Sequence, residues 1–271
     1  MNYKMIAIDL DNTLLTSEKK VDRETADLIK KADTAGKKVV LATGRMFEAA
    51  VPFLEELELD TPLITYNGAL VKDVNRKVIQ KSLISEDLTK EIIKFAEDYG
   101  LHIHYYSDGN YYYRWENKYA KDYVETTGIS GIETRVELQN YIKDPALKLL
   151  IIEDEKKRRE YFKTELNKFY RNRLSISSSM ESFIEITASN VNKGRALAEI
   201  ADSYNILPEE IIAVGDGYND LSMLEMAGLG VAMENAPEEI RSKADRITQS
   251  NDKQGVAKVL EYFLSCNDET E

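Results

Sequence analysis

The chain has 271 residues, 43% of them hydrophobic, which is enough for one large α/β domain or two modest ones. Its formal net charge of -12 argues against nucleic acid and anionic membranes as partners, because both are bound through Lys and Arg. No run of about 18 apolar residues occurs and the single cysteine, Cys266, lies in a polar tail, so we expect a cytoplasmic protein without membrane spans or disulfides.

Short apolar runs alternate with amphipathic segments in the first part of the chain. Strands are predicted at 5–8, 39–42 and 63–64, and helices at 22–35 and 47–57. This alternation is the βαβαβ pattern of a parallel sheet. Asp22 is predicted to cap the first helix at its N-terminus, and Gly36 to follow its C-terminus.

The middle of the chain differs, being rich in Tyr. A hairpin is predicted from 102–106 and 111–115 around the turn residues 107–110. Further along, the sequence predicts a strand at 147–152, a helix at 156–170 and an antiparallel pair at 174–176 and 183–186. These elements are typical of an α+β unit.

The βα pattern returns near the C-terminus. Helices are predicted at 196–204, 221–227, just after Pro237 and at 256–264, with strands at 211–214 and 229–233. We therefore predict an α/β fold: a Rossmann-like parallel sheet core from residues 1–83 and 188–271, with an α+β cap domain, residues 84–187, inserted into it.

Two carboxylates follow the first strand, in Asp9-Leu10-Asp11-Asn12-Thr13-Leu14. The period of two along a strand places Asp9 and Asp11 on one side of its carboxyl end, where ligands bind in open α/β sheets. Such a pair requires a cation or a shared proton. One ionised Asp can then attack phosphorus while the other donates a proton to the leaving alcohol. Taken alone, the motif also fits a turn that ends a strand.

Three later segments reach the same sheet edge. Thr43-Gly44-Arg45 follows the second strand, and its hydroxyl and N–H groups can hold phosphate oxygens. Gly215 to Asp220 follows a later strand with two more carboxylates and an amide, which suit Mg²⁺. Lys193 begins a helix and can bring an ammonium group to the cluster. Separately, these segments also fit a helix cap, a flexible turn and a surface lysine.

Together, in this order, the motifs resemble the haloacid dehalogenase (HAD) superfamily, specifically the Cof-type phosphatases of subclass IIB. The resemblance extends over nearly the whole chain and includes Tyr66-Asn67-Gly68-Ala69 and 231–236. It implies a Mg²⁺-dependent phosphatase that acts on small phosphorylated metabolites, which in this family include sugar phosphates, pyridoxal phosphate and flavin-type phosphates. One departure is Glu234, which stands where the family usually has Gly and is expected to alter a loop near the mouth.

The resemblance also implies a role for each matching residue. Asp9 would form an aspartyl-phosphate, and Asp11 would be the general acid and base. The metal site would comprise Asp9, Asp11 through its backbone carbonyl, Asp216, and Asp220, which would orient Lys193 or the metal's waters. Phosphate or substrate would be contacted by the Leu10 backbone, Thr43, Gly44, Arg45, Asn67, Lys193 and Asn219.

The insert is implied to close over the active site and to recognise the leaving group. Its aromatic residues are expected mostly to pack the cap sheet on its helices, and a zinc site at His102 and His104 lacks a third ligand. Two other functions remain open: a phosphomutase, which returns the phosphoryl group to a sugar, and a non-catalytic phosphometabolite sensor. We expect a monomer or a weak homo-oligomer.

Overall fold

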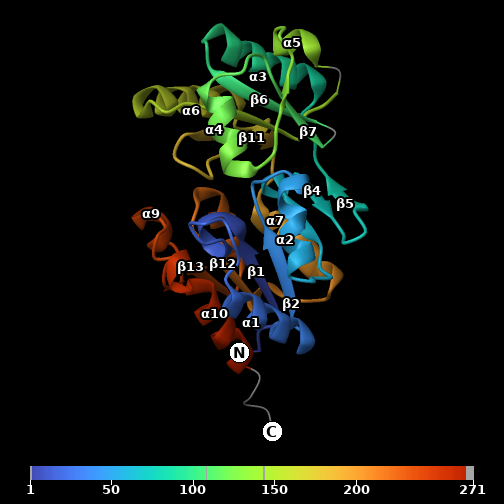
Figure 1. Cartoon of the computed structure of the whole chain (residues 1–271), viewed down its shortest axis with the longest axis vertical. Coiled ribbons are helices and arrows are strands. Elements are labelled where there is room, and N and C mark those ends of the chain that lie inside the picture. Colours follow the sequence, from blue (N-terminus) through green and yellow to red (C-terminus); the bar gives the residue numbers. More distant parts are fainter. Residues whose placement is uncertain (1, 108, 143, 267–271) are drawn as a thin grey trace.

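The chain folds around two β-sheets, shown in Figure 1 of the computed structural model. The structure describes residues 2–107, 109–142 and 144–266. Asp108, in the turn of the predicted hairpin, and residues 267–271 of the polar tail lie outside these ranges. No helix in the described ranges is both long enough and apolar enough to cross a membrane.

The larger sheet has eight strands and joins the two ends of the chain. Its spatial order is β14 (Arg246–Ile247), β13 (Leu229–Ala232), β12 (Ile211–Gly215), β1 (Met5–Asp9), β2 (Lys38–Ala42), β3 (Leu63–Thr65), β4 (Leu70–Lys72) and β5 (Val78–Lys81). Strands β14 to β3 are parallel, with Ile8 beside Val214 where β1 meets β12. The prediction of one sheet from both ends is confirmed. The antiparallel hairpin of β4 and β5 was not predicted.

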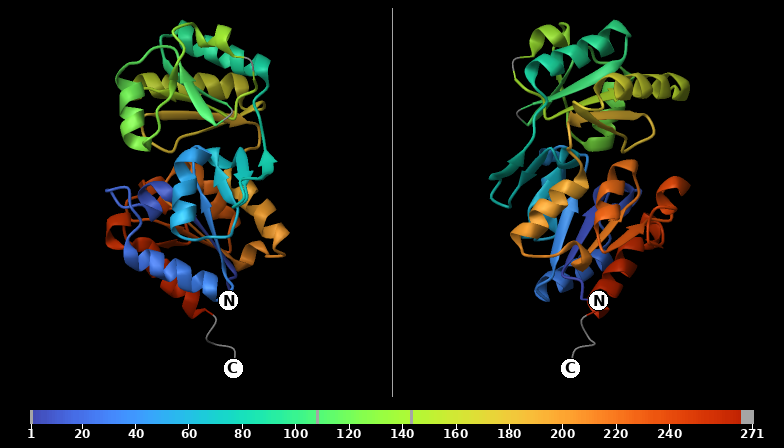
Figure 2. Two further views of the ribbon diagram at one scale, coloured as in Figure 1. Left: turned by 45° about the vertical axis from the view of Figure 1, so that its right-hand side comes forward. Right: turned by 180° about the vertical axis from the view of Figure 1, so that it is seen from behind.

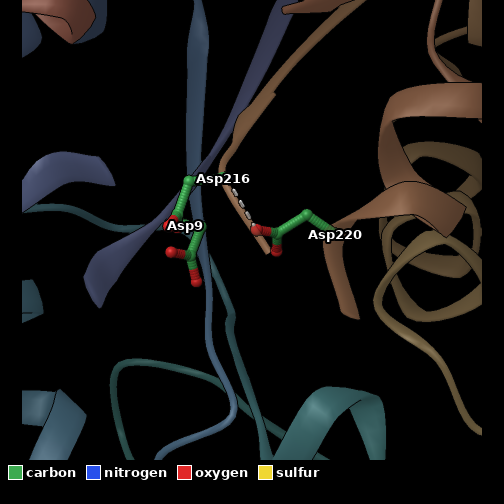
Figure 3. Close-up of side chains that lie close together, drawn as sticks. All are labelled: Asp9, Asp216 and Asp220. Atoms are coloured by element: carbon green, nitrogen blue, oxygen red, sulfur yellow. Dashed lines mark hydrogen bonds between the residues drawn. The ribbon is translucent and has the colours of Figure 1, made fainter. Parts of the chain in front are cut away.

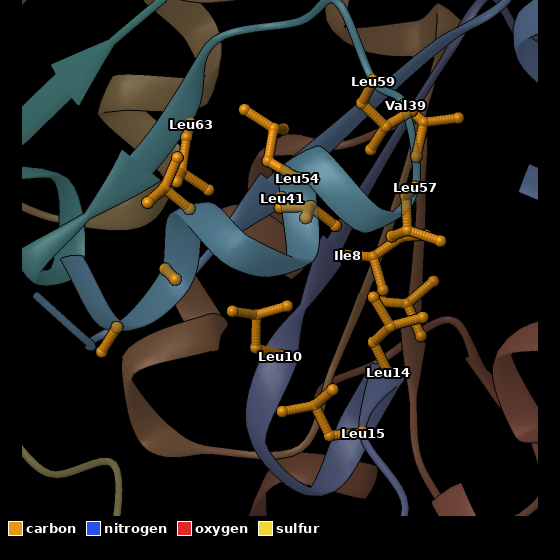
Figure 4. Close-up of a cluster of buried hydrophobic side chains, with 14 of the residues drawn as sticks. Ile8, Leu10, Leu14, Leu15, Val39, Leu41, Leu54, Leu57, Leu59 and Leu63 are labelled. Atoms are coloured by element: carbon orange, nitrogen blue, oxygen red, sulfur yellow. The ribbon is translucent and has the colours of Figure 1, made fainter. Parts of the chain in front are cut away.

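Helices cover both faces of the larger sheet. One face carries α1 (Arg23–Thr34), α2 (Phe47–Glu56) and α10 (Gly255–Ser265), and the other carries α7 (Lys193–Ser203), α8 (Leu221–Met226) and α9 (Glu238–Arg241). Alternate strand residues serve the two faces: Ile8 and Leu41 contact the first group of helices, and Ala7 and Val40 the second. Figure 4 shows the first cluster, with Leu54 of α2 among the strand residues. Each fully buried Leu or Ile contributes about 1.5–3 kcal/mol.

The ends of α1 follow the predicted capping. Asp22 accepts a hydrogen bond from the Thr25 backbone N–H at 3.0 Å. Gly36 follows the helix with φ +77°, in the left-handed region that glycine adopts without strain. Both predictions are confirmed, and the chain then enters β2 at Lys38.

The smaller sheet has six strands, and Figure 2 shows from two sides that it stands above the larger one. Its order is β10 (Leu174–Ser177), β11 (Phe183–Ala188), β9 (Lys148–Ile152), β6 (His102–Ser107), β7 (Asn110–Tyr113) and β8 (Ile132–Glu133). One face packs on α3 (Glu86–Asp98), α5 (Leu138–Tyr141) and α6 (Lys156–Tyr170), and the other on α4 (Lys118–Thr127). The α+β character is as predicted, and β11 ends one residue beyond the predicted boundary of the insert.

Aromatic side chains fill the face that carries α4. Tyr106, Tyr111 and Tyr123 are buried against each other, with ring centroids 5.2–6.5 Å apart. Their packing within the insert confirms the expectation for most of these residues. The two histidines lie beside them and hydrogen-bond each other, with Nε2 of His102 2.8 Å from Nε2 of His104.

Candidate active site

Three carboxylates converge at the carboxyl end of the larger sheet. Asp9 is the last residue of β1, Asp216 follows β12, and Asp220 precedes α8. One oxygen of each lies within 4.8 Å of the others (Figure 3). Asp9 and Asp220 are buried, at 5% and 1% exposure. The adjacency of β1 and β12 therefore assembles an acidic cluster from segments about 200 residues apart.

Lys193 is the cation of this cluster. Its Nζ donates to Oδ1 of Asp9 and to Oδ1 of Asp220, both at 2.6 Å, and its side chain is fully buried. It is the first residue of α7. Asn192 caps the N-terminus of this helix, because its side chain accepts a hydrogen bond from the Arg195 backbone N–H. Burial would lower the pKa of Lys193, but the two carboxylates outweigh it and raise this pKa. The ammonium is therefore charged.

Asp220 also shapes the loop that carries Asp216. Its Oδ2 accepts from the backbone N–H groups of Asp216, at 2.9 Å, and Gly217, at 2.8 Å. The Asp220 side chain packs so closely on Gly215 that a Cβ at Gly215 would lie 2.6 Å from it. The glycine is thus required by this close approach, and Asp220 connects Lys193 to the loop.

The cluster holds more negative charge than Lys193 balances. Burial, and then the charge of Asp220, raise the pKa of Asp9 well above its ordinary value. The same two causes raise the pKa of Asp216 to about 7. Closely spaced carboxylate oxygens of this kind fit a hard divalent cation such as Mg²⁺, which would relieve the repulsion.

Asp11 faces a different cation. Arg45 donates from Nε to Oδ2 and from Nη2 to Oδ1 of Asp11, both at 2.7 Å, and Lys19 Nζ lies 3.4 Å from Oδ1. Burial would raise the pKa of Asp11, but Arg45, assisted by Lys19, outweighs it and lowers this pKa. The next residue, Asn12, has φ 57°, so the chain turns directly after Asp11. Arg45, expected near phosphate, is here the partner of Asp11.

The remaining phosphate-site candidates lie around Gly44. Thr43 follows β2, and its Oγ1 accepts from the Arg45 N–H at 3.1 Å. Asn219 Nδ2 donates to Asn67 Oδ1 at 2.9 Å, and a Cβ on Gly44 would lie 2.9 Å from this same Oδ1. The structure therefore brings Thr43, Gly44, Asn67 and Asn219 together. Leu10 has a fully buried side chain in the core, so only its backbone is suitable for contact.

A cleft opens over these groups between the two sheets. The empty space between its walls is about 500 Å³, part of which is open solvent. Its lining includes Asp9, Asp11, Thr43, Gly44, Arg45, Asp216 and Asn219 from the larger sheet's side, and Tyr123, Lys148, Met180, Phe183 and Glu185 from the insert. Lys148 and Glu185 were not among the predicted site residues. Each is a charged residue in an otherwise apolar strand, a pattern that indicates a buried charge with a partner.

Glu234 lies outside the residues that line this cleft. Its side chain is exposed and pairs with Lys253, at 3.2 Å. Its carbonyl accepts from Arg241 Nη1, also at 3.2 Å. The substitution at this position therefore adds a surface ion pair, and the neighbouring Asn235 still reaches the carbonyl of Asn12 at 2.9 Å.

Comparison with known proteins identifies the family of this chain. A family model described as haloacid dehalogenase-like hydrolase matches residues 6–260. A 5-amino-6-(5-phospho-D-ribitylamino)uracil phosphatase of Bacillus subtilis is 31% identical, over 97% of this chain and 98% of its own. A crystal structure of TM0651 from Thermotoga maritima has TM-score 0.82 and 32% identity, covering 96% and 97% of the two chains. The HAD subclass IIB sugar phosphatase BT4131 has TM-score 0.85 and 26% identity, covering 96% and 98%. The chain belongs to the haloacid dehalogenase-like hydrolases and is a Cof-type phosphatase of subclass IIB.

Proposed function

We propose that this phosphatase is Mg²⁺-dependent and hydrolyses small phosphorylated metabolites, such as sugar phosphates, through an aspartyl-phosphate on Asp9. One observation carries the proposal: a buried lysine holds the strand-end Asp9 inside a cluster of further carboxylates. The printed names of two related proteins, a phospho-ribityl compound phosphatase and a sugar phosphatase, support small phosphomonoesters as substrates.

In the first step, a carboxylate oxygen of Asp9 attacks phosphorus and the bond to the leaving alcohol breaks. Lys193 offsets the repulsion between Asp9 and the phosphate dianion, because its ammonium lies 2.6 Å from Asp9. Thr43 and the Gly44 backbone are placed to hold phosphoryl oxygens, together with Asn219. Fixed positions and neutralised charge supply most of the acceleration in phosphoryl transfer.

Asp11 moves the protons of the reaction. In the first step it gives a proton to the leaving oxygen, and in the second it takes one from the water that opens the aspartyl-phosphate. The ion pair with Arg45 favours the ionised form of Asp11, which is the form that takes a proton in the second step. The first step requires the protonated form, so Asp11 must separate from Arg45 and gain a proton before the alcohol leaves.

The acidic cluster is also suited to hold the metal. Asp9 and Asp216 are the side-chain ligands that we propose, with the backbone carbonyl of Asp11 as a third protein ligand. Asp220 completes the cluster and positions Lys193. Mg²⁺, when bound, would neutralise charge on the phosphoryl group and on these carboxylates.

We further propose that residues 84–187 act as the cap of a core built from residues 1–83 and 188–271. The cleft supports this division, since its walls come from both parts. A cap in this position excludes water from the phosphoryl group.

Phosphate release from a panel of phosphomonoesters, with and without Mg²⁺, tests the proposal. Asp9→Asn is expected to abolish release, because an amide is a poor nucleophile. Asp60→Asn, at an exposed carboxylate, is the matched control and should retain native rates. Turnover in Asp9→Asn equal to that of the native protein would falsify the nucleophile, and metal-independent turnover would contradict the cofactor.

A further inference from the structure

Two charged side chains of the insert project from its sheet toward the larger one. Lys148 begins β9 and Glu185 lies within β11, its antiparallel neighbour. The neighbouring residues Leu149, Ile151 and Ile184 point the other way, into the apolar layer under α3 and α6. Alternation along the strands therefore places Lys148 and Glu185 on the face that looks into the cleft.

Lys148 links the insert to the phosphate loop. Its Nζ donates to the Gly44 carbonyl oxygen at 2.7 Å and to Oε1 of Glu185 at 3.0 Å, and it lies 4.9 Å from the centre of the Tyr106 ring. Lys148 and Glu185 are 2% and 1% exposed. An ammonium group has three donors, so these two hydrogen bonds leave one donor for a ligand.

Glu185 keeps an oxygen for a ligand. Its Oε2 is buried and accepts no hydrogen bond of ordinary geometry from the residues that the structure describes, although the side chains of Asn67 and Ser179 lie near the carboxylate. Burial would raise the pKa of Glu185, but Lys148, with smaller contributions from Asn67 and Ser179, outweighs it and lowers this pKa, so the carboxylate is charged. A buried, charged acceptor without a partner is costly. Because Glu185 lines the same cleft as Asp9, an O–H group of a bound substrate is well placed to donate a hydrogen bond to Oε2 of Glu185.

We propose that Glu185 is a specificity-determining residue, which accepts a hydrogen bond from a hydroxyl group of the leaving alcohol, and that Lys148 positions it over the phosphate loop. This inference rests on the proposed phosphatase function and adds to it the residue, Glu185, that distinguishes one leaving alcohol from another. It assigns as preferred substrates phosphate esters of polyhydroxylated alcohols, over esters of the same carbon skeleton without hydroxyls.

Matched substrates test this preference without altering the phosphoryl group. The pairs are glycerol 3-phosphate with propyl phosphate, and glucose 6-phosphate with tetrahydropyran-2-ylmethyl phosphate, which keeps the ring oxygen and lacks the hydroxyls. A hydrogen bond to a charged group corresponds to roughly a 10- to 150-fold difference in kcat/KM. We expect the native enzyme to favour the hydroxylated member of at least one pair by such a factor.

The variant is Lys148→Met with Glu185→Leu, because removing one partner alone would leave a buried charge unpaired, whereas apolar replacement of both is usually tolerated. The preference should fall to near unity in this double variant, because the hydroxylated esters lose more kcat/KM than the esters without hydroxyls. The control is Lys94→Gln with Asp98→Asn, which removes an exposed ion pair of the insert and should keep the native preference.

The outcomes separate the two proposals. Equal kcat/KM within both pairs for the native enzyme, or a preference that survives in the double variant, would overturn the role of Glu185 while leaving the phosphatase function intact. An equal loss of activity on all four esters in the double variant would leave Lys148 and Glu185 with a structural role alone and would overturn the proposal. No phosphate release from any ester, p-nitrophenyl phosphate included, would instead overturn the proposed function, and this inference with it.

Discussion

The acidic cluster predicts that the metal-free protein loses stability as the pH rises. Burial and the charge of Asp220 raise the pKa of Asp216 to about 7, against an ordinary value of 3.8. Between these two pH values the folded protein holds a proton that the unfolded chain has released. Folding is therefore favoured at the acidic end of this window, and the contribution is lost as the pH rises through 7.

The size of the effect follows from the shift. The whole shift is about three pH units, and about two of them lie above pH 5; at about 1.4 kcal/mol per unit the change between pH 5 and pH 8 is at most roughly 3 kcal/mol. For a chain of this size that corresponds to roughly 8 °C in Tm. Bound Mg²⁺ requires the ionised carboxylates, so it should restore stability at pH 8 and have little effect at pH 5.

Thermal unfolding at pH 5 and pH 8, in EDTA and in excess Mg²⁺, measures both effects. Asp216→Asn should flatten the pH dependence and reduce the response to Mg²⁺, because the amide neither titrates nor binds the cation well. Asp60→Asn, at an exposed carboxylate, should behave as the native protein does. The reasoning is wrong if Asp216→Asn keeps the native dependence on pH, or if Mg²⁺ stabilises it equally.

Three further variants probe the other contacts of the site. Arg45→Met should raise the pKa of Asp11, because burial then acts without its main opposing cation. Since Asp11 must be protonated in the first step, the alkaline limb of kcat/KM should move to higher pH, and an unmoved limb would refute the role of this ion pair. Lys193→Met should lower kcat by about 10²–10³-fold, whereas Arg195→Met, at an exposed cation of the same helix, should not; equal losses would argue against a specific role for Lys193. Gly44→Ala would bring a Cβ within 2.9 Å of Asn67, so phosphate affinity should fall while circular dichroism stays native; unchanged KM for the substrate and Ki for inorganic phosphate would show that the loop adapts.

The candidate active-site residues could be predicted because they directly follow strands that short apolar runs indicate. Asp9 directly ends β1 and Thr43 directly follows β2, so a parallel sheet alone brings them to one edge. No strand order was predicted, because local periodicity carries no information on which strands are neighbours. The pairing of β1 with β12, which places Asp216 beside Asp9, comes from the structure.

Other features depend on contacts that the sequence does not encode locally. The ion pair between Arg45 and Asp11 joins two loops. Arg45 had been expected to contact phosphate or substrate, and the Asp11 side chain to act as general acid and base. Tyr66 and Asn67 have positive φ values of 52° and 57°, which tertiary packing imposes. Lys148 reaches Gly44 only because the insert lies over the larger sheet, and an isolated strand prediction gives no such placement.

The ion pairs of the cleft show where a cation is still needed. Lys193 pairs with Asp9 and Asp220, Arg45 with Asp11, and Lys148 with Glu185. Asp216 differs: among the described residues no Lys or Arg forms an ion pair with it, and its Oδ1 accepts only the Thr13 hydroxyl, at 3.1 Å. A partly buried carboxylate without a cation is unfavourable unless protonated, as the raised pKa of Asp216 reflects. Within the cleft, the Lys and Arg side chains that the structure describes therefore leave Asp216 without an ion-pair partner, and the divalent ion that we propose would compensate this carboxylate most of all.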